Sequence, residues 1–303
     1  MTKEFEFINH IREKFSLDKI GDDCAVLPKN ETHDMLITSD LIVEDIDFRR
    51  SWMIPHLLGH KALAVSLSDI AAMGGKPLYS MLSIGIPEDI WQTDFVDEFY
   101  EGYFNLAKNY KLELIGGDVS KTPDKIVIDS TVIGEVKKHK AVMRKGAKVG
   151  DLIFVTGELG GASIGLKFLE ENIAGFDELK MCQLKPNPRI SEGLFLSEFA
   201  TSMIDISDGL SSDLMHICQS SKVGAKIYAD KIPYPEFEFR NLEFALNGGE
   251  DFELLFTANP KKNFNKNFGS FFCIGEITAN VESIELIADG KSVVLEPKGH
   301  QHF

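Results

Sequence analysis

The feature that most constrains this chain is an apolar stretch at residues 61–77. Leu63, Leu67 and Ile70 recur at the three- and four-residue spacing of a helix, and Val65 makes the opposite side apolar as well. A helix that is apolar nearly all round is typical of a protein interior. Two glycines and a proline close the stretch, as expected at a helix C-terminus. The sequence therefore predicts a buried helix.

One carboxylate interrupts this apolar helix. Asp69 is the only ionisable residue between Lys61 and Lys76. Burying an unpaired carboxylate is unfavourable by an amount on the order of several kcal/mol. No Lys, Arg or His lies within helical reach, so we expect a metal ion, or a basic group from elsewhere in the chain, beside Asp69. The alternative is an Asp that accepts hydrogen bonds from backbone amides at a helix break.

Length and composition indicate two domains. The chain has 303 residues, of which 44% are apolar, and this is enough to bury two cores. Residues 144–151 form a basic connection that contains glycines, and we place the boundary there. An N-terminal domain at 1–145 and a C-terminal domain at 146–303 follow. Strands and helices alternate in both halves, which predicts an α/β (α+β) fold class.

The net charge of −15 argues against nucleic acid or an anionic membrane as a partner, because both require a basic face. Cys24, Cys182, Cys218 and Cys273 are dispersed, which excludes a zinc ribbon and offers no disulfide framework. No apolar run is long enough to span a bilayer, and the N-terminus has no signal-peptide core. We therefore expect a cytoplasmic protein.

Periodicity gives the expected elements. Helices are predicted at 5–15, 61–73, 94–108, 163–171, 189–200, 210–220 and 237–246. Strands are predicted at 35–43, 78–86, 112–118, 125–136, 152–156, 203–209, 273–277, 284–288 and 292–295. Residues 175–188 are polar and show no period, which predicts an irregular surface segment.

Carboxylates stand at the breaks between these elements, most of them beside glycines. They are Asp22, Asp23, Asp40, Asp69, Asp118, Asp205, Asp208, Glu250 and Asp251. Each motif taken alone is more simply a turn. Their joint occurrence favours a site with hard oxygen ligands, which suit magnesium or manganese rather than zinc. So many carboxylates indicate several ions shared with a polyphosphate, and a nucleoside triphosphate is the natural candidate.

The order and spacing of these motifs resemble the thiamine-monophosphate kinase family, which belongs to the superfamily of aminoimidazole ribonucleotide synthetase and selenophosphate synthetase. The matching motifs lie at residues 21–25, 38–40, 61–74, 116–118, 144–148, 205–210, 248–254 and 298–303. The resemblance implies an N-terminal domain whose mixed sheet pairs with that of a second subunit, and a C-terminal α/β sandwich domain. It also implies a reaction in which ATP phosphorylates thiamine monophosphate to thiamine diphosphate.

The resemblance also implies roles for individual residues. The implied magnesium ligands are Asp23, Thr38, Ser39, Asp40, Asp69, Asp118, Asp205 and Asp208. The implied contacts to ATP are Tyr100, Gly117, Asp118, Arg144 and Ser207, and the implied catalytic residues are Asp118, Arg144 and Asp205. On the acceptor side the resemblance places Asp47, Glu250, Asp251, His300 and Phe303. Asp47 stands where the family usually has His, and His300 where it usually has an aromatic residue.

The implied reaction is direct in-line transfer, in which the acceptor phosphate attacks the γ-phosphorus of ATP with several magnesium ions in the site. A phosphate monoester is largely ionised near neutral pH, so no strong general base is needed. Purine-precursor cyclisation, another ATP-dependent reaction of the superfamily, is the main alternative. A metal-dependent phosphohydrolase also needs clustered carboxylates, and a non-enzymatic nucleotide sensor is a third possibility.

Overall fold

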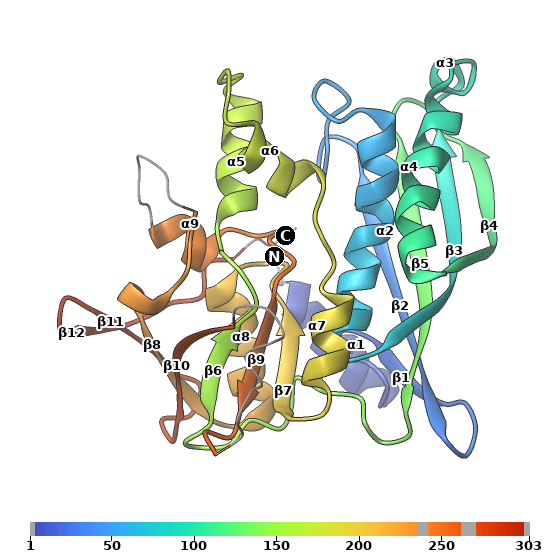
Figure 1. Ribbon diagram of the computed structural model, residues 1–303. Coiled ribbons are helices and arrows are strands. Elements are labelled where there is room, and N and C mark those ends of the chain that lie inside the picture. The colour runs from blue at the N-terminus through green and yellow to red at the C-terminus, as the bar shows by residue number, and fades with distance from the viewer. Residues whose placement is uncertain (1–3, 236–241, 262–270, 300–303) are drawn as a thin grey trace.

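The structure, a computed structural model, describes residues 4–235, 242–261 and 271–299. These residues form two sheets with helices packed against them, as the predicted fold class requires. Figure 1 shows the five-stranded N-terminal sheet on the right and the seven-stranded C-terminal sheet at the lower left. No helix in the described ranges is long and apolar enough to cross a bilayer.

The N-terminal sheet has the strand order β1-β2-β5-β3-β4 and is mixed, because β3 and β4 are parallel while the other pairs are antiparallel. The strands are β1 (Ala25–Pro28), β2 (His33–Val43), β3 (Lys76–Ile86), β4 (Glu113–Lys121) and β5 (Val127–Lys137). Burial alternates along β2 and β5, as expected for a sheet with helices on one face. The helices of this half are α1 (Glu4–Phe15), α2 (Pro55–Ala72), α3 (Glu88–Trp91) and α4 (Phe95–Tyr110).

Helix α2 is the buried helix that the sequence predicts. It packs on β2, β5 and α4 of its own half and on α7 and β7 of the other half. It therefore has apolar neighbours on all sides, which explains why its sequence lacks a polar face.

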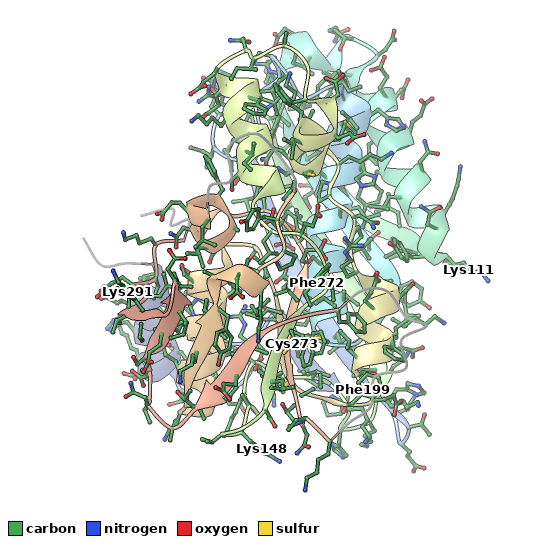
Figure 2. The ribbon with its side chains drawn as sticks, turned by 60° about the vertical axis from the view of Figure 1, so that its left-hand side comes forward. Lys111, Lys148, Phe199, Phe272, Cys273 and Lys291 are labelled. Atoms are coloured by element: carbon green, nitrogen blue, oxygen red, sulfur yellow. The ribbon has the colours of Figure 1, made fainter. Side chains whose placement is uncertain are left out.

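The C-terminal sheet has the order β12-β11-β8-β10-β6-β9-β7. Its strands are β6 (Leu152–Val155), β7 (Ala200–Asp205), β8 (Gly224–Tyr228), β9 (Leu254–Ala258), β10 (Phe272–Thr278), β11 (Ile284–Ala288) and β12 (Lys291–Val294). Its helices are α5 (Gly161–Glu170), α6 (Asp177–Leu184), α7 (Ile190–Leu196), α8 (Leu210–Ser221), η1 (Ala229–Lys231) and α9 (Leu242–Asn247). Figure 2 shows Cys273 on the middle strand β10 and Lys291 on the outermost strand β12.

The segment 175–188 is not irregular as predicted, although more than half of its residues are exposed, as expected for a surface segment. Helix α6 occupies most of it and packs on α5, and Gln183 is buried. The helix is short and only weakly amphipathic, so its hydrophobic pattern gives little signal. Helix α7 also ends earlier than predicted because strand β7 begins at Ala200. The domain boundary at 145/146 falls in the connection between β5 and β6 and stays a prediction.

The crossing of α2 and α4 gives the first testable prediction. A Cβ atom on Gly102 would lie 1.8 Å from the carbonyl oxygen of His56, and one on Gly59 would lie 1.9 Å from that of Phe99. We expect Gly102→Ala to lower the free energy of unfolding by about 2 to 3 kcal/mol, because backbone has to move apart. Gly116→Ala is the control, since nothing lies within 4 Å of its added Cβ. Equal denaturant midpoints for the two variants would contradict this prediction.

Candidate active site

The site begins where Asp69 on helix α2 faces strand β2. Thr38 and Asp40 lie on the face of β2 that carries α2, and the Thr38 hydroxyl donates a hydrogen bond to Asp69. The intervening residue, Ser39, points to the opposite face because side chains alternate along a strand. Its hydroxyl contacts Asp129 there. The polar break in β2 therefore supplies two side chains to the site rather than three.

Carboxylates from distant segments meet at this point. One oxygen from each of Asp23, Asp69 and Asp205 lies within 4.8 Å of the other two. Asp23 precedes β1, and Asp205 ends β7 in the C-terminal sheet, where it accepts a 2.6 Å hydrogen bond from Ser68. The groups that surround Asp69 are thus mainly acidic. Of the two compensating groups that the sequence predicts for this carboxylate, a metal ion is therefore favoured over a basic side chain.

Burial and mutual repulsion raise the pKa values of these carboxyl groups. Burial and the charges of Asp40 and Asp205 raise the pKa of Asp69 well above its usual value. Burial is also the main cause that raises the pKa of Asp205 to about 7 and that of Asp40 to about 6. Without a cation the folded chain therefore favours the protonated form of these groups, and a bound cation would take the place of the protons.

Arg144 is the basic residue of this cluster. Its Nε lies 3.0 Å from Asp23 Oδ1, and its backbone N–H donates a 2.6 Å hydrogen bond to Asp22. Burial nevertheless raises the pKa of Asp23, and it raises that of Asp22 to about 6. One guanidinium does not balance the carboxylates Asp22, Asp23, Asp40, Asp69 and Asp205.

The donor set fits divalent cations. Asp23 Oδ2 and Asp40 Oδ2 are buried and have no hydrogen-bond partner among the described residues. Buried carboxylate oxygens that lack a donor are suited to a cation. All the ligand atoms are hard oxygens, which favour magnesium or manganese.

A cleft of about 710 Å³ opens beside the cluster, within the size range of small-molecule sites. Residues of both halves of the chain line the cleft. They include Asp40 and Trp52 of the N-terminal half and Ser207, Asp208 and Glu250 of the C-terminal half. The cleft therefore places carboxylates from the two halves around one space.

A second acidic group adjoins the cleft. Ligand atoms of Asp208, Asp213 and His216 lie within 4.8 Å of one another. Asp213 accepts a 3.0 Å hydrogen bond from the Gly209 amide at the start of α8. Burial and the charge of Asp208 raise the pKa of Asp213 well above its usual value.

Comparison with known proteins decides the family. Residues 21–136 match the AIR synthase related protein N-terminal domain, and residues 148–280 match the corresponding C-terminal domain. The thiamine-monophosphate kinase of Buchnera aphidicola subsp. Schizaphis graminum is 38% identical over 99% of this chain and 98% of its own length. That of Escherichia coli K12 is 38% identical over 94% of this chain and 91% of its own. This chain belongs to the thiamine-monophosphate kinase family.

A solved structure agrees with this assignment. The structure of AaThiL complexed with AMPPCP and TMP is 34% identical in sequence to this chain and superposes with a TM-score of 0.91. The match covers 99% of this chain and 97% of the AaThiL chain. The family resemblance inferred from the sequence is therefore confirmed.

Several residues that the family resemblance suggested do lie at the cleft or the cluster. The carboxylate cluster contains Asp23, Thr38, Asp40, Asp69, Arg144 and Asp205, and the cleft is lined by Asp47, Ser207, Asp208 and Glu250. Their roles in the family reaction stay predictions.

Asp251, which the resemblance places on the acceptor side, does not line the cleft. Its carboxylate accepts hydrogen bonds of 2.6 Å and 3.2 Å from the amides of Gly160 and Ala162 at the start of helix α5. Of the neighbouring pair of acids, Glu250 is the one that lines the cleft. Asp47 also lines it, but one of its oxygens accepts a 2.7 Å hydrogen bond from the Val43 amide.

Asp118 does not join the carboxylate cluster within one chain, contrary to expectation. It pairs with Ser83 on β3, and the register continues through Asp129 to Leu41. It therefore lies three strands from β2, about 14 Å away at the usual strand spacing, on the face opposite to Asp40.

Gly117 and Tyr100 are also apart from the cluster. Gly117 precedes Asp118 on the edge strand β4, where an added Cβ would lie 1.8 Å from the Leu82 carbonyl oxygen. Tyr100 lies on α4, where its ring stacks on Phe104 at 6.1 Å beside a separate surface groove. His300 and Phe303 lie outside the described residues.

The sequence suggests no role for Lys61 or Gln183, which both border the cleft. A lysine in an almost wholly apolar helix indicates a buried charge that needs a partner, and this signal could have identified Lys61. Gln183 had no such signal because its segment shows no periodicity. Asp213 and His216 also went unnoticed, although their i, i+3 spacing brings them to one side of the helix predicted at 210–220.

The raised pKa values predict a pH dependence. An Asp whose pKa rises from 3.8 to about 6 or 7 on folding favours the protonated form, so the stability that it contributes is lost as pH rises through that range. In the presence of a chelator, the melting temperature should fall between about pH 5 and pH 8. Excess Mg²⁺ should raise the melting temperature most at the upper end of this pH range. A melting temperature that rises with pH in the chelator would contradict the charge balance described above.

Proposed function

We propose that this chain transfers the γ-phosphoryl group of ATP to thiamine monophosphate and so forms thiamine diphosphate. The observation that supports this most is the carboxylate cluster beside a cleft of substrate size, in a chain 34% identical to a structure holding AMPPCP and TMP. AMPPCP is an analogue of ATP, so nucleotide and acceptor occupy one protein in that relative.

We assign the magnesium sites to Asp23, Asp40, Asp69 and Asp205, with Asp208 on the other side of the cleft. Bound magnesium ions would neutralise the phosphate charges and orient the triphosphate. Ser68 and Thr38 hold two of these carboxylates in place through their hydroxyl groups. This limits the reorganisation that cation binding requires.

The residues of the chain have simple tasks in an in-line transfer. The acceptor phosphate is largely ionised near neutral pH, so its oxygen attacks the γ-phosphorus without losing a proton to a strong base. The bond to the β-phosphate oxygen breaks, and ADP leaves. Arg144, held between Asp22 and Asp23, places a fixed positive charge near the triphosphate. Glu250 lines the cleft, where it would face the acceptor.

We also propose a homodimer that forms through the outer face of the N-terminal sheet. Leu41, Tyr79 and Met81 are between 41% and 60% exposed on that face. Ile37, Ile133 and Tyr79 pair in one row across three strands of it. Exposed apolar side chains in such rows, beside the polar Ser39, Asp129 and Asp118 of the same face, are suited to a matching face of a second copy.

In this dimer Asp118 would serve the site of the partner. Leu41 lies on the same outer face as Asp118 and also lines the cleft, so the cleft reaches the proposed dimer face. The implied contacts of Tyr100 and Gly117 with ATP stay predictions. The expected cytoplasmic location stays a prediction.

The first test is acceptor dependence. ADP formation should require both Mg²⁺ and thiamine monophosphate, and thiamine diphosphate should appear in equal amount. Phosphate release without the acceptor would indicate a phosphohydrolase instead. Activity on a purine precursor, but not on thiamine monophosphate, would indicate the cyclisation chemistry.

The carboxylate cluster predicts an unusual pair of effects for Asp69→Asn. Turnover should fall by at least about 100-fold, because a charge that binds the cations is lost. The chelated protein should melt at a higher temperature than wild type, because one of the repelling carboxylates is gone. Asp151→Asn is the control, since this buried Asp binds Lys148 and Thr201 away from the cleft. Full activity in Asp69→Asn would contradict the assignment.

The shared site predicts complementation between two inactive variants. Asp118→Asn and Asp69→Asn should each be nearly inactive alone. When the two chains are unfolded and refolded together, half of the dimers are mixed, and each mixed dimer has one intact site. The mixture should then recover about a quarter of wild-type activity. No recovery, with mixed dimers present by mass spectrometry, would place Asp118 in the site of its own chain.

A further inference from the structure

A lysine is buried under the acceptor side of the cleft. The side chain of Lys61 is 1% exposed, and it lies in helix α2 among apolar neighbours. Its ammonium group lies 2.7 Å from Glu250 Oε1 and donates a 3.3 Å hydrogen bond to the Gln183 carbonyl oxygen. A buried ammonium is strongly unfavourable without such partners, so this arrangement is fixed in the folded protein.

Glu250 is held from a second direction as well. The side-chain amide of Gln183 donates to Glu250 Oε2, while Lys61 occupies Oε1. The backbone N–H of Glu250 donates a 2.8 Å hydrogen bond to the carbonyl oxygen of Ser207. The backbone φ of Glu250 is +65°, which a residue with a side chain adopts only when its surroundings hold it there.

These contacts leave one part of the carboxylate for a ligand. Each oxygen of an ionised Glu has two acceptor positions, and Lys61 and Gln183 each use one. The Glu250 side chain remains 29% exposed, and it opens into the cleft. The remaining acceptor positions therefore face the space where the acceptor substrate would lie.

The three residues come from different parts of the fold. Lys61 lies on α2 of the N-terminal half, Gln183 on α6, and Glu250 in the loop before β9. The position of Glu250 therefore depends on how the two halves pack together.

We propose that Lys61 and Gln183 are positioning residues for acceptor recognition, and that they act through Glu250. They hold its carboxylate in an orientation in which it accepts a hydrogen bond from an N–H donor of the acceptor, such as the amino group of the thiamine pyrimidine. This inference rests on the proposed function. It assigns no contact between Lys61 and either substrate.

The test is steady-state kinetics of the full-length chain with thiamine monophosphate and ATP varied separately. Lys61→Met and Gln183→Leu should each raise KM for thiamine monophosphate by about tenfold, while KM for ATP changes by less than about twofold. Gln183→Leu is the second variant because it buries no unpaired charge of its own. Gln183 Oε1 has no hydrogen-bond partner among the described residues, so removing this oxygen leaves no donor of those residues without an acceptor.

A double-mutant cycle separates positioning from direct contact. Glu250→Gln should raise KM for thiamine monophosphate, and adding Lys61→Met to it should produce no further rise, because Lys61 acts only through Glu250. Additive effects of the two substitutions would overturn the inference.

Arg189→Met is the matched structural control. Arg189 forms an ion pair with Glu253, with its Nε 2.7 Å from Oε2, but neither residue lines the cleft. This variant should lose stability without a selective change in KM for thiamine monophosphate. If Lys61→Met behaves like Arg189→Met, the inference is wrong. If ADP formation by the wild type does not depend on thiamine monophosphate, both the proposed function and this inference are wrong. If ADP formation does depend on thiamine monophosphate but the effects of Lys61→Met and Glu250→Gln on KM are additive, this inference alone is wrong.

Discussion

The repulsion among buried carboxylates is the constraint on which the rest of this structure depends. Asp23, Asp69 and Asp205 come from three distant segments and approach within 4.8 Å of one another. Such an arrangement is unfavourable by itself, so the packing around helix α2 has to maintain it. The helix is apolar on all sides because β2 and β5 cover one side and α7 and β7 another. The rigid interior thus holds acidic groups in a position that they would otherwise leave.

The packing that fixes the acidic groups at the proposed cation site also fixes Glu250 at the proposed acceptor site. On the cation side, acidic residues have too few basic partners, and a divalent ion with a polyphosphate is the natural complement. On the acceptor side, Glu250 has a buried lysine as its partner and keeps free acceptor positions. The same helix α2 carries Asp69 and Lys61, two turns apart. One element therefore helps to position both the carboxylates proposed to bind cations and the carboxylate proposed to recognise the acceptor.

Much of this could be predicted from the sequence, for identifiable reasons. An apolar helix with one Asp predicted both a buried helix and a compensating site at Asp69. The motifs around Asp23 and Asp205 carried the family resemblance. Strand alternation, applied strictly, would have removed Ser39 from the site. The cap that Asp251 makes on α5, and the sheet register that takes Asp118 to the far face, depend on tertiary structure. No local pattern shows them.

The repulsion among these carboxylates is relieved if they hold divalent cations together with the nucleotide, as we propose. A crystal structure with Mn²⁺ and an ATP analogue, recorded at a wavelength where manganese scatters anomalously, tests it most directly. We expect anomalous peaks between Asp23, Asp69 and Asp205, with the phosphates of the nucleotide bound to the same ions. A nucleotide bound in the cleft with no anomalous peak at these carboxylates would contradict it.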